Sequence, residues 1–438
     1  MFKTLPGFRA FSPEDCSKRD YIFDVWRRTA KSFAFREFDP PILESLDLFT
    51  EKSGEEIKSQ LFEFVDKGGR AVALRPEMTP SLARMVGEKA SGIRKPVKWF
   101  AIGENFRYER QQKGRLRAFF QYNADILGED SIYADAEIIA LLIESLRALG
   151  LSENEFQLRL GDRNIWAAFL EDCGLPESAI IPALSAVDKI AKVPSEVFDE
   201  ILSSAISGTS IPAASLASKI RNFIKLKSIE DISANFSSAA SQKAELRLAD
   251  WRKLLNILDS MGLAKFVSPD LGIVRGLAYY TGFVFEAFQT VGSGRALAGG
   301  GRYDALVKKL GYQDMPAVGF GMGDVTVSDL LELVGKQKSL PLSPEVFVVI
   351  GSEASRNKAV SIASDLRAEG ITVDYPFKLS GFGKQFKQAD AVGANLALVI
   401  GDDELLSNTA KLKNLKTGLE SLVPFDSISS TIKSILNR

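Results

Sequence analysis

Five basic side chains lie close together in one short stretch of the sequence, between two segments that alternate polar and apolar residues. They are Arg107, Arg110, Lys113, Arg115 and Arg117. A guanidinium group holds two phosphate oxygens at once, so several of them on one loop predict a site for a polyphosphate. The alternative is a solvated basic turn on a surface hairpin, because charged residues are common in loops. The basic stretch alone does not decide between these interpretations.

The segments on either side of the basic stretch have the two-residue period of β-strands. In the second segment, Phe119, Gln121, Asn123 and Asp125 fall on one face, and apolar residues fall on the other. We therefore expect an antiparallel hairpin that presents a polar row above an apolar floor. Gln121 and Asp125 offer an amide and a carboxylate beside the basic loop, which favours a small polar ligand.

A second candidate group lies in the sequence L-R-P-E-M-T-P, residues 74–80. Pro76 restricts the backbone, so that Glu77 and Thr79 lie on the same side of an extended chain. A carboxylate and a hydroxyl on one side suit the ammonium group of a ligand. Equally, Thr79 is a candidate cap for a helix that starts at Thr79-Pro80.

The composition excludes several kinds of chemistry. The chain has 438 residues, a net charge of −1, two cysteines and no histidine. Without histidine it lacks the commonest general base and zinc ligand, so any catalysis must use positioning, charge, carboxylates or lysines. Because the net charge is near zero, a nucleic acid would have to be held by local basic patches.

The cysteines and the lengths of the apolar runs predict where in the cell the protein works. Cys16 and Cys173 fit no metal or redox spacing, and we expect buried thiols in a reducing, cytoplasmic setting. The sequence has neither an 18-residue apolar run nor a charged and apolar leader. We therefore expect no membrane span and no secretion.

The stretch 104–128 resembles motif 2 of the class II aminoacyl-tRNA synthetases. Its pattern F-R-x-E-R…G-R-x-R-x-F-x-Q is similar to that of the histidyl-tRNA synthetases in particular. The segment around Pro40 and Pro41 resembles motif 1, which forms the homodimer in that class. Residues 273–286 and 298–307 resemble two histidine-specific peptides, and residues 316–332 resemble motif 3. The motifs follow the family's order over nearly the whole chain.

The resemblance implies an α/β protein with an α+β catalytic domain, whose antiparallel sheet is flanked by helices. It implies an enzyme, a histidine–tRNA ligase that uses ATP and Mg2+ to join L-histidine to tRNA(His), and a homodimer. The implied domains are a catalytic domain at 1–335 with a helical insertion at about 165–262, a linker at 336–344 and an anticodon-binding domain at 345–438.

The resemblance also implies roles for residues at the nucleotide. Arg107 and Arg275 would be catalytic, because they would neutralise charge on the α-phosphate. The implied ATP-binding residues are Arg107, Glu109, Arg115 and Arg275. Mg2+ would bridge the phosphates, and no protein side chain is firmly assigned to it. For the acceptor end of the tRNA, the implied residues in the basic loop are Arg110, Gln112 and Lys113.

For the amino acid, the resemblance implies two groups of contacts. Glu77, Thr79 and Gln121 would hold the α-amino end, and Asp125 with Tyr280 would bind the imidazole ring. The full implied set is Glu77, Thr79, Gln121, Asp125, Tyr279, Tyr280 and Tyr303.

Two positions depart from the family's pattern. Thr326 stands where motif 3 has an arginine, and Ala278 stands where the first histidine-specific peptide has an aspartate. They favour an alternative: a synthetase-like regulatory subunit of ATP phosphoribosyltransferase that no longer makes adenylate. The retained arginines and the tail domain argue against it. A third reading, a plain RNA-binding module, would not need the amino-acid pocket.

The elements that would position these residues can be outlined from periodicity. We expect helices at about 16–35 and 134–149, a hairpin at 62–64 and 71–74, and, within 273–286, a strand preceded by a tight turn at Arg275-Gly276. In the insertion, Phe223, Lys225 and Lys227 are candidates to contact phosphates, although the insertion could equally pack for its own stability.

Beyond the linker, strands and helices alternate as in a small parallel α/β domain. Residues 384–394 resemble the anticodon-binding domain shared by several class II synthetases. Lys384 and Lys387, near the start of an expected helix, would suit an RNA backbone.

Overall fold

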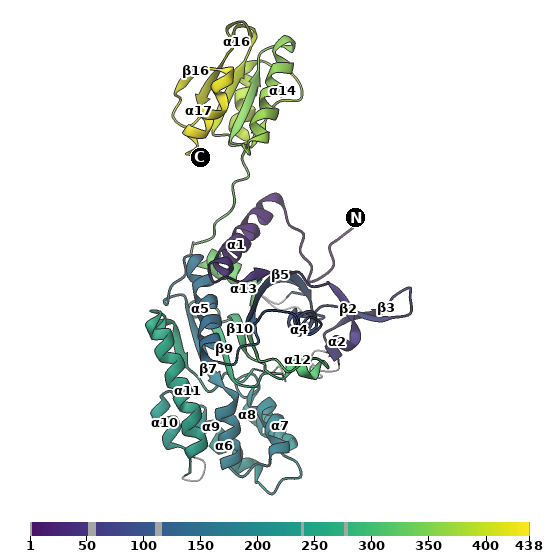
Figure 1. The fold of residues 1–438 in the computed structure, drawn as a ribbon, viewed down its shortest axis with the longest axis vertical. Coiled ribbons are helices and arrows are strands. Elements are labelled where there is room, and N and C mark those ends of the chain that lie inside the picture. Colours follow the sequence, from purple (N-terminus) through teal and green to yellow (C-terminus); the bar gives the residue numbers. More distant parts are fainter. Residues whose placement is uncertain (1, 51–57, 110–115, 238–240, 276–278, 438) are drawn as a thin grey trace. The chain divides into compact units, whose positions relative to one another are not determined.

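The computed structural model describes residues 2–50, 58–109, 116–237, 241–275 and 279–437. The chain forms two compact units, Met1–Ser339 and Leu340–Arg438. The division falls inside the segment 336–344 that was predicted to be a linker. Each unit has its own sheet and its own apolar core (Figure 1).

An eight-stranded sheet lies at the centre of the first unit, with the strand order β1-β5-β6-β11-β10-β9-β7-β8 (Figure 1). Only the outermost pairs, β1 with β5 and β7 with β8, are parallel. The predicted antiparallel sheet is therefore confirmed. The strands are β1 Arg36–Glu37, β5 Val97–Phe106, β6 Ala118–Leu127, β7 Phe156–Asp162, β8 Val267–Pro269, β9 Phe283–Gln289, β10 Ala296–Arg302 and β11 Ala317–Gly323.

The hairpin β5–β6 has the two faces that its alternation predicted. Tyr122, Ala124 and Ile126 are buried in the main apolar core, and the ring of Trp26 stacks on Tyr122 with centroids 5.3 Å apart. On the other face, Trp99 pairs with Asp125 across the two strands. The strands thus turn one face to helices and leave the other for polar side chains.

Three helices cover the apolar face: α1 Pro13–Ser32, α5 Ile132–Ala148 and α13 Asp324–Leu333. The start of α1 is fixed by a capping box, in which the hydroxyl of Ser12 accepts from the backbone N–H of Asp15. Just beyond α5, Gly150 has a φ of +92°, a conformation that glycine adopts most readily. Both helices were predicted within a few residues, although α1 ends before Phe33.

The opposite face carries two shorter helices at one end, α4 Thr79–Gly87 and α12 Leu306–Lys309. Beside them lies a small sheet with the order β2-β4-β3. Its predicted hairpin is confirmed, and its elements are β2 Leu43–Ser45, α2 Leu46–Thr50, β3 Phe62–Val65 and β4 Ala71–Leu74. Arg75 is buried and donates to the carbonyls of Pro40 (2.5 Å) and Glu104 (2.9 Å), which ties the Pro40-Pro41 segment to the end of β5.

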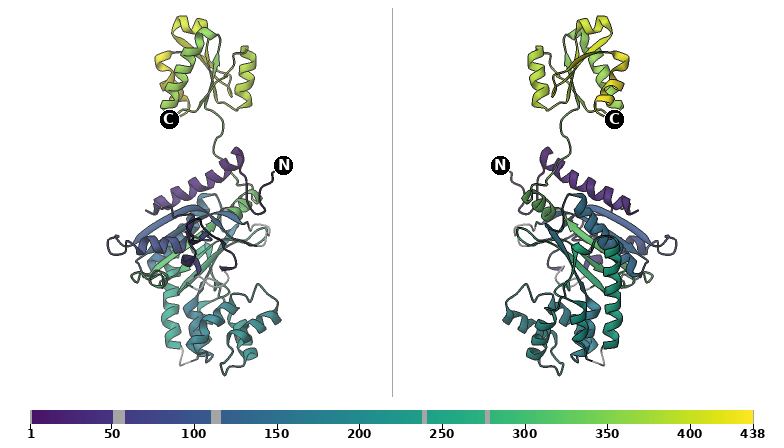
Figure 2. Two further views of the ribbon diagram at one scale, coloured as in Figure 1. Left: turned by 90° about the vertical axis from the view of Figure 1, so that its right-hand side faces the viewer. Right: turned by 90° about the vertical axis from the view of Figure 1, so that its left-hand side faces the viewer.

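The insertion is helical, as predicted, and Figure 2 shows its helices gathered at one end of the first unit. They are α6 Arg163–Asp172, α7 Glu177–Val187, α8 Ser195–Ala205, α9 Ala213–Phe223, α10 Ile229–Ala234 and α11 Ser241–Ser260, followed by the 3-10 turn η1 Ala264–Phe266. The suggestion that Phe223 contacts phosphates is wrong. Its ring is fully buried and stacks on Phe169 with centroids 3.9 Å apart.

Arg275 has a φ of +58°, which fits the tight turn expected there. The strand expected to follow that turn begins only at Phe283, as β9. The rings of Tyr279 and Tyr280 are both buried, with centroids 5.1 Å apart, instead of alternating across a sheet. The aromatic and β-branched residues of this segment predicted a strand. Instead, the side chains of Tyr279 and Tyr280 line the neighbouring cavity. Ala278 lies outside the described residues.

The second unit has a five-stranded sheet with the order β13-β12-β14-β15-β16. The first three strands are parallel, as predicted, but β15 and β16 form an antiparallel hairpin that was not. Gly418 in its turn has a φ of +75° and was the local signal for that hairpin. The elements are β12 Val346–Ile350, α14 Glu353–Ala368, β13 Val373–Asp374, α15 Phe382–Ala391, β14 Leu396–Ile400, α16 Asp402–Ser407, β15 Thr409–Asn414, β16 Glu420–Pro424, η2 Phe425–Ser427 and α17 Ile428–Ile435.

Within the described ranges, no helix is both long enough and apolar enough to cross a lipid bilayer. Cys16 and Cys173 are free thiols. Both are only partly buried, so the expectation of buried thiols is not met in full.

Candidate active site

A cavity of about 430 Å³, including the space at its mouth, opens on the polar side of the hairpin β5–β6. Nine of the predicted site residues line it: Glu77, Thr79, Arg107, Gln121, Asp125, Arg275, Tyr279, Tyr280 and Tyr303. Asn123, Gly299, Gly319, Phe320 and Gly321 complete the lining. Residues that the sequence separates by more than two hundred positions thus meet at one site.

The remaining predicted residues of the nucleotide and acceptor sites are not in this lining. Arg110, Gln112, Lys113 and Arg115 lie outside the described residues. Glu109 is described but does not line the cavity; its carbonyl accepts from the guanidinium of Arg117 at 3.4 Å.

Asp125 lies at the closed side of the cavity and is almost fully buried. Its Oδ1 accepts from the hydroxyl of Tyr303 at 2.6 Å, whereas its Oδ2 has no hydrogen-bond partner among the described residues. Burial raises the pKa of Asp125 to about 7; the Tyr303 hydroxyl opposes that shift, and the nearby Glu77 adds to it. The carboxylate is therefore anchored by one oxygen and offers the other.

Glycine at position 319 makes room for this carboxylate. Gly319 pairs with Asp125 across strands β11 and β6. A Cβ atom at Gly319 would overlap Oδ1 of Asp125 and also approach the carbonyl of Ala124. Any larger residue would push the carboxylate out of its place.

Glu77 repeats the arrangement on the other side of the cavity. Its Oε2 accepts from the hydroxyl of Tyr279 at 2.8 Å, and its Oε1 has no partner among the residues that the structure describes. Burial raises the pKa of Glu77, although Arg107, the Tyr279 hydroxyl and Arg275 all act to lower it. Thr79 is the first residue of α4, whose N-cap is Met78, so the interpretation of Thr79 as the helix cap is wrong.

Two arginines face the same cavity. Arg107 donates from Nε to the carbonyl of Pro76 at 3.0 Å, and Arg275 donates from Nη1 to Glu286 at 3.2 Å. The Nε of Arg275 is buried and has no partner within the described part of the chain. Burial acts to lower the pKa of Arg275, but Tyr280 and Glu286 raise it above its ordinary value, so the group stays charged.

A further glycine admits the second arginine. A Cβ atom at Gly299 of β10 would overlap the Nη1 of Arg275. Glycine at position 299 therefore has a steric reason.

Two asparagines belong to the site and were not assigned from the sequence. Asn105 donates to the amide oxygen of Gln121 at 3.0 Å, which orients that amide. Asn123 lines the cavity, and its Oδ1 has no partner among the described residues. Alternation had already put Asn123 on the same strand face as Gln121 and Asp125, so the signal for it was present.

The described residues offer little to hold a metal by themselves. They contain no group of three or more acidic or cysteine side chains that could bind an ion. Glu286 is engaged by Arg275.

The start of α13 carries the departure from motif 3. The carbonyl of Thr326 accepts from Gln289 at 3.4 Å. Nearby, Asp324 is buried, forms an ion pair with Arg9 at 2.8 Å and accepts from the backbone N–H of Phe120 at 2.9 Å. The cation at this helix start thus comes from the N-terminal segment.

Comparisons with known proteins agree with this geometry. A family model described as histidyl-tRNA synthetase matches residues 7–325, and one described as anticodon binding domain matches residues 345–435. The histidine–tRNA ligase of Opitutus terrae is 49% identical over 100% of this chain and 99% of its own. That of Natronomonas pharaonis is 36% identical over 97% of this chain and 96% of its own.

Among solved structures, the histidyl-tRNA synthetase from Nostoc sp. superposes with a TM-score of 0.78 at 25% identity, covering 99% of each chain. The large antiparallel sheet flanked by helices and the matched family model are those of a class II aminoacyl-tRNA synthetase. With matches of this length and identity, the chain belongs to the histidyl-tRNA synthetase family.

Proposed function

We propose that this synthetase activates L-histidine with ATP and then transfers it to the 3′ end of tRNA(His). The histidine carboxylate attacks the α-phosphorus, pyrophosphate leaves, and the adenylate passes histidine to the terminal ribose. One observation carries the proposal. Two buried carboxylates, Asp125 and Glu77, each keep one oxygen without a partner among the described residues, in a cavity that two arginines also line.

Histidine is selected by its two polar ends. The free Oδ2 of Asp125 accepts from a ring N–H, with Tyr280 beside it, and Tyr303 holds the other oxygen in place. The free Oε1 of Glu77, with Thr79 and Gln121, receives the ammonium group. Any other amino acid would leave a buried carboxylate unmatched, which is the strongest basis for rejecting it.

Activation of histidine relies on positive side chains that are already positioned around the phosphates before the reaction. Arg107 and Arg275 neutralise the charge that develops on the α-phosphate, while Arg115 and Glu109 complete the ATP site by family resemblance. Mg2+, if bound with ATP, would supply further neutralisation of the phosphates. Such a reaction needs little covalent help from the protein, so the absence of histidine from the chain removes nothing essential.

The tRNA would contact both units. Lys384 and Lys387 are exposed on α15, where the buried Gln385 exchanges two hydrogen bonds of 2.8 Å with the backbone of Ile350 and thereby orients the helix. Arg110, Gln112 and Lys113 are assigned to the acceptor end. The setting we propose is the cytoplasm.

A homodimer would form through the motif 1 segment around Pro41. Ile42 and Leu43 in that segment are apolar, yet 49% and 42% of their surfaces are exposed. A second subunit would cover them.

The proposal is tested by histidine-dependent exchange of pyrophosphate into ATP. The wild-type enzyme should show exchange, and Arg275→Ala should abolish it. Arg295→Ala is the control, because Arg295 forms an ion pair with Asp329 at 2.8 Å and does not line the cavity. A regulatory subunit of ATP phosphoribosyltransferase, which Thr326 and Ala278 would favour, would show no exchange, and neither would an RNA-binding module.

A further inference from the structure

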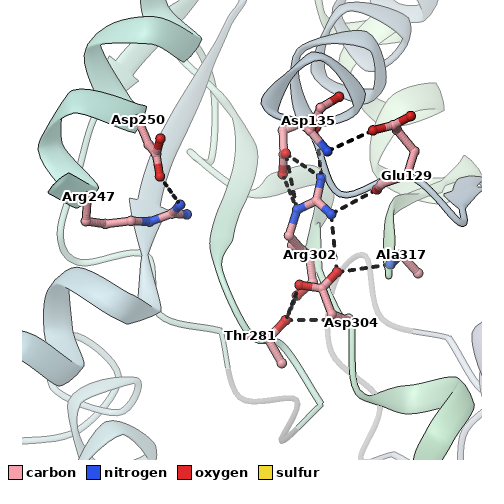
Figure 3. Close-up of polar contacts among 9 residues, drawn as sticks. Glu129, Asp135, Arg247, Asp250, Thr281, Arg302, Asp304 and Ala317 are labelled. Atoms are coloured by element: carbon pink, nitrogen blue, oxygen red, sulfur yellow. Dashed lines mark hydrogen bonds and ion pairs between the residues drawn. The ribbon is translucent and has the colours of Figure 1, made fainter. Parts of the chain in front are cut away.

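The side chain of Arg302, at the end of β10, is the centre of a partly buried polar network outside the lining of the amino-acid cavity (Figure 3). Its Nε and Nη2 donate to the carboxylate of Asp135, in the first turn of α5, with the shortest distance 2.5 Å. Its Nη1 donates to the carbonyl of Glu129 at 3.1 Å and to Asp304 at 3.2 Å. None of these contacts touches the cavity itself.

The network joins the two segments that carry the cavity's tyrosines. Arg302 directly precedes Tyr303, whose hydroxyl donates to Asp125. Thr281 directly follows Tyr280. The backbone N–H of Thr281 donates to the carbonyl of Arg302 at 2.8 Å, so the two segments lie side by side.

The hydroxyl of Thr281 both accepts and donates a hydrogen bond with Asp304 (Figure 3). It accepts from the backbone N–H of Asp304 at 3.1 Å and donates to the Asp304 carboxylate at 3.3 Å. The same carboxylate accepts from the backbone N–H of Ala317, at the start of β11, at 3.0 Å. The position of Thr281 is therefore fixed relative to both β10 and β11.

Such an arrangement sets geometry more than it adds stability. The Arg302 and Asp135 side chains are only 8% and 2% exposed, and the cost of removing two charges from water offsets most of their attraction. The network does hold each of its side chains in one position, because every N–H donor of Arg302 has an acceptor. A ring that must fit between two tyrosine-bearing segments needs that precision.

We propose that Thr281, held by Arg302 and Asp304, is a positioning residue that sets the separation of Tyr280 and Tyr303 and thereby the fit of the imidazole ring. This inference rests on the proposed function and adds to it a specificity element outside the cavity lining. It predicts that the hydroxyl of Thr281 affects histidine more than ATP. Among the described residues, Arg107 and Arg275 donate to Pro76 and Glu286 and not to Arg302, Asp304 or Thr281, and Arg275 approaches the network only through the ring of Tyr280, 5.5 Å from its guanidinium.

The test is Thr281→Val, which keeps the shape of the side chain and removes the hydroxyl. In the exchange assay the KM for histidine should rise about tenfold, the effect of losing roughly one well-placed hydrogen bond. The KM for ATP and the kcat at saturating histidine should stay within about twofold of wild type. Thr281→Ser restores the hydroxyl and should return the KM for histidine to near the wild-type value.

The chain offers a control threonine beyond the other end of β9. Thr290 directly follows β9, and its hydroxyl donates to the backbone carbonyl of Asn154 at 2.5 Å. Thr290→Val should leave both KM values unchanged. If Thr281→Val behaves like Thr290→Val, or if it raises both KM values equally, the inference is wrong.

The serine variant guards against a trivial loss of structure. If Thr281→Val fails to fold, Thr281→Ser must still match the wild-type KM for histidine, and a serine variant with a raised KM refutes the role of the hydroxyl. If the wild-type protein itself shows no histidine-dependent exchange, the proposed function fails instead. The two failures are therefore distinguishable.

Discussion

The two sheets of this molecule differ in how many of their faces are covered by apolar packing. In β12 of the second unit, Val346, Val348 and Ile350 belong to one apolar cluster, and Phe347 and Val349 belong to another. Both faces of that sheet are therefore covered. In β6 of the first unit, Tyr122 and Ala124 face the core, while Asn123 and Asp125 face the cavity.

The difference determines where each unit can recognise a ligand. A sheet with one uncovered face can hold buried polar groups on rigid strands and surround a small molecule with them. A sheet covered on both faces can contact a ligand only at its edges and through its covering helices, as with the exposed Lys384 and Lys387 on α15. The first unit should therefore show large, ligand-specific effects of substitution, and the second unit small effects that depend on salt.

The largest effect is expected at Asp125. Asp125→Asn keeps the size of the side chain but replaces the free acceptor, so the kcat/KM for histidine in pyrophosphate exchange should fall by about a thousandfold or more. Asp199→Asn, in a partly exposed ion pair with Arg221 in the insertion, is the control and should be near wild type. A loss under tenfold at Asp125 would remove it from ring recognition.

Glu77→Gln should follow, with a loss of about a hundredfold, because a charge-assisted hydrogen bond to the ammonium group becomes a neutral one. Free imidazole, which has the ring but no ammonium group, separates the two carboxylates. Its inhibition constant should be unchanged in Glu77→Gln and raised in Asp125→Asn. The reverse pattern would exchange the two roles.

The raised pKa of Asp125 predicts how stability depends on pH in the ligand-free enzyme. Because burial raises this pKa from 3.8 to about 7, the folded state binds a proton that the unfolded state releases between those values. The group's contribution to stability is thus present in acid and is lost as the pH rises through about 7. Asp125→Asn lacks this titration, so its melting temperature should rise relative to wild type from pH 5 to pH 8, by several degrees. A constant difference would mean that Asp125 titrates normally.

The smallest effect is expected in the second unit. The double variant Lys384→Ala, Lys387→Ala should leave pyrophosphate exchange unchanged and raise the KM for tRNA by a few-fold. The slope of log KM against log salt should fall by about 2, one unit for each lysine removed. An effect on exchange would show that the two units are coupled in activation.

The sequence predicted best where a pattern has a single physical solution. Strict alternation in 118–127 requires one face in the core, and Tyr122, Ala124 and Ile126 confirm it. The helix expected at about 16–35 is also confirmed, and the cap at Ser12 fixes its start. The alternation of β6 also placed Asn123, which only the cavity revealed as part of the site.

The sequence predicted poorly where long-range contacts override local preference. The composition of 279–286 favours a strand, but Tyr279 is withdrawn from the sheet by its hydrogen bond to Glu77, about two hundred positions away. Phe223 was predicted to contact phosphates together with Lys225 and Lys227, whereas helix packing buries its ring. Nothing local to Arg302 indicates that it binds Asp135, since Asp135 lies on helix α5, more than 160 positions earlier in the chain.

The central claim is that histidine enters with its ring at Asp125 and its ammonium group at Glu77. The most direct measurement is a crystal structure of the enzyme with bound histidine. We expect a ring nitrogen within hydrogen-bonding distance of Oδ2 of Asp125 and the ammonium nitrogen beside Oε1 of Glu77. A ring that lies away from Asp125, or an ammonium group bound outside the cavity, would contradict the account.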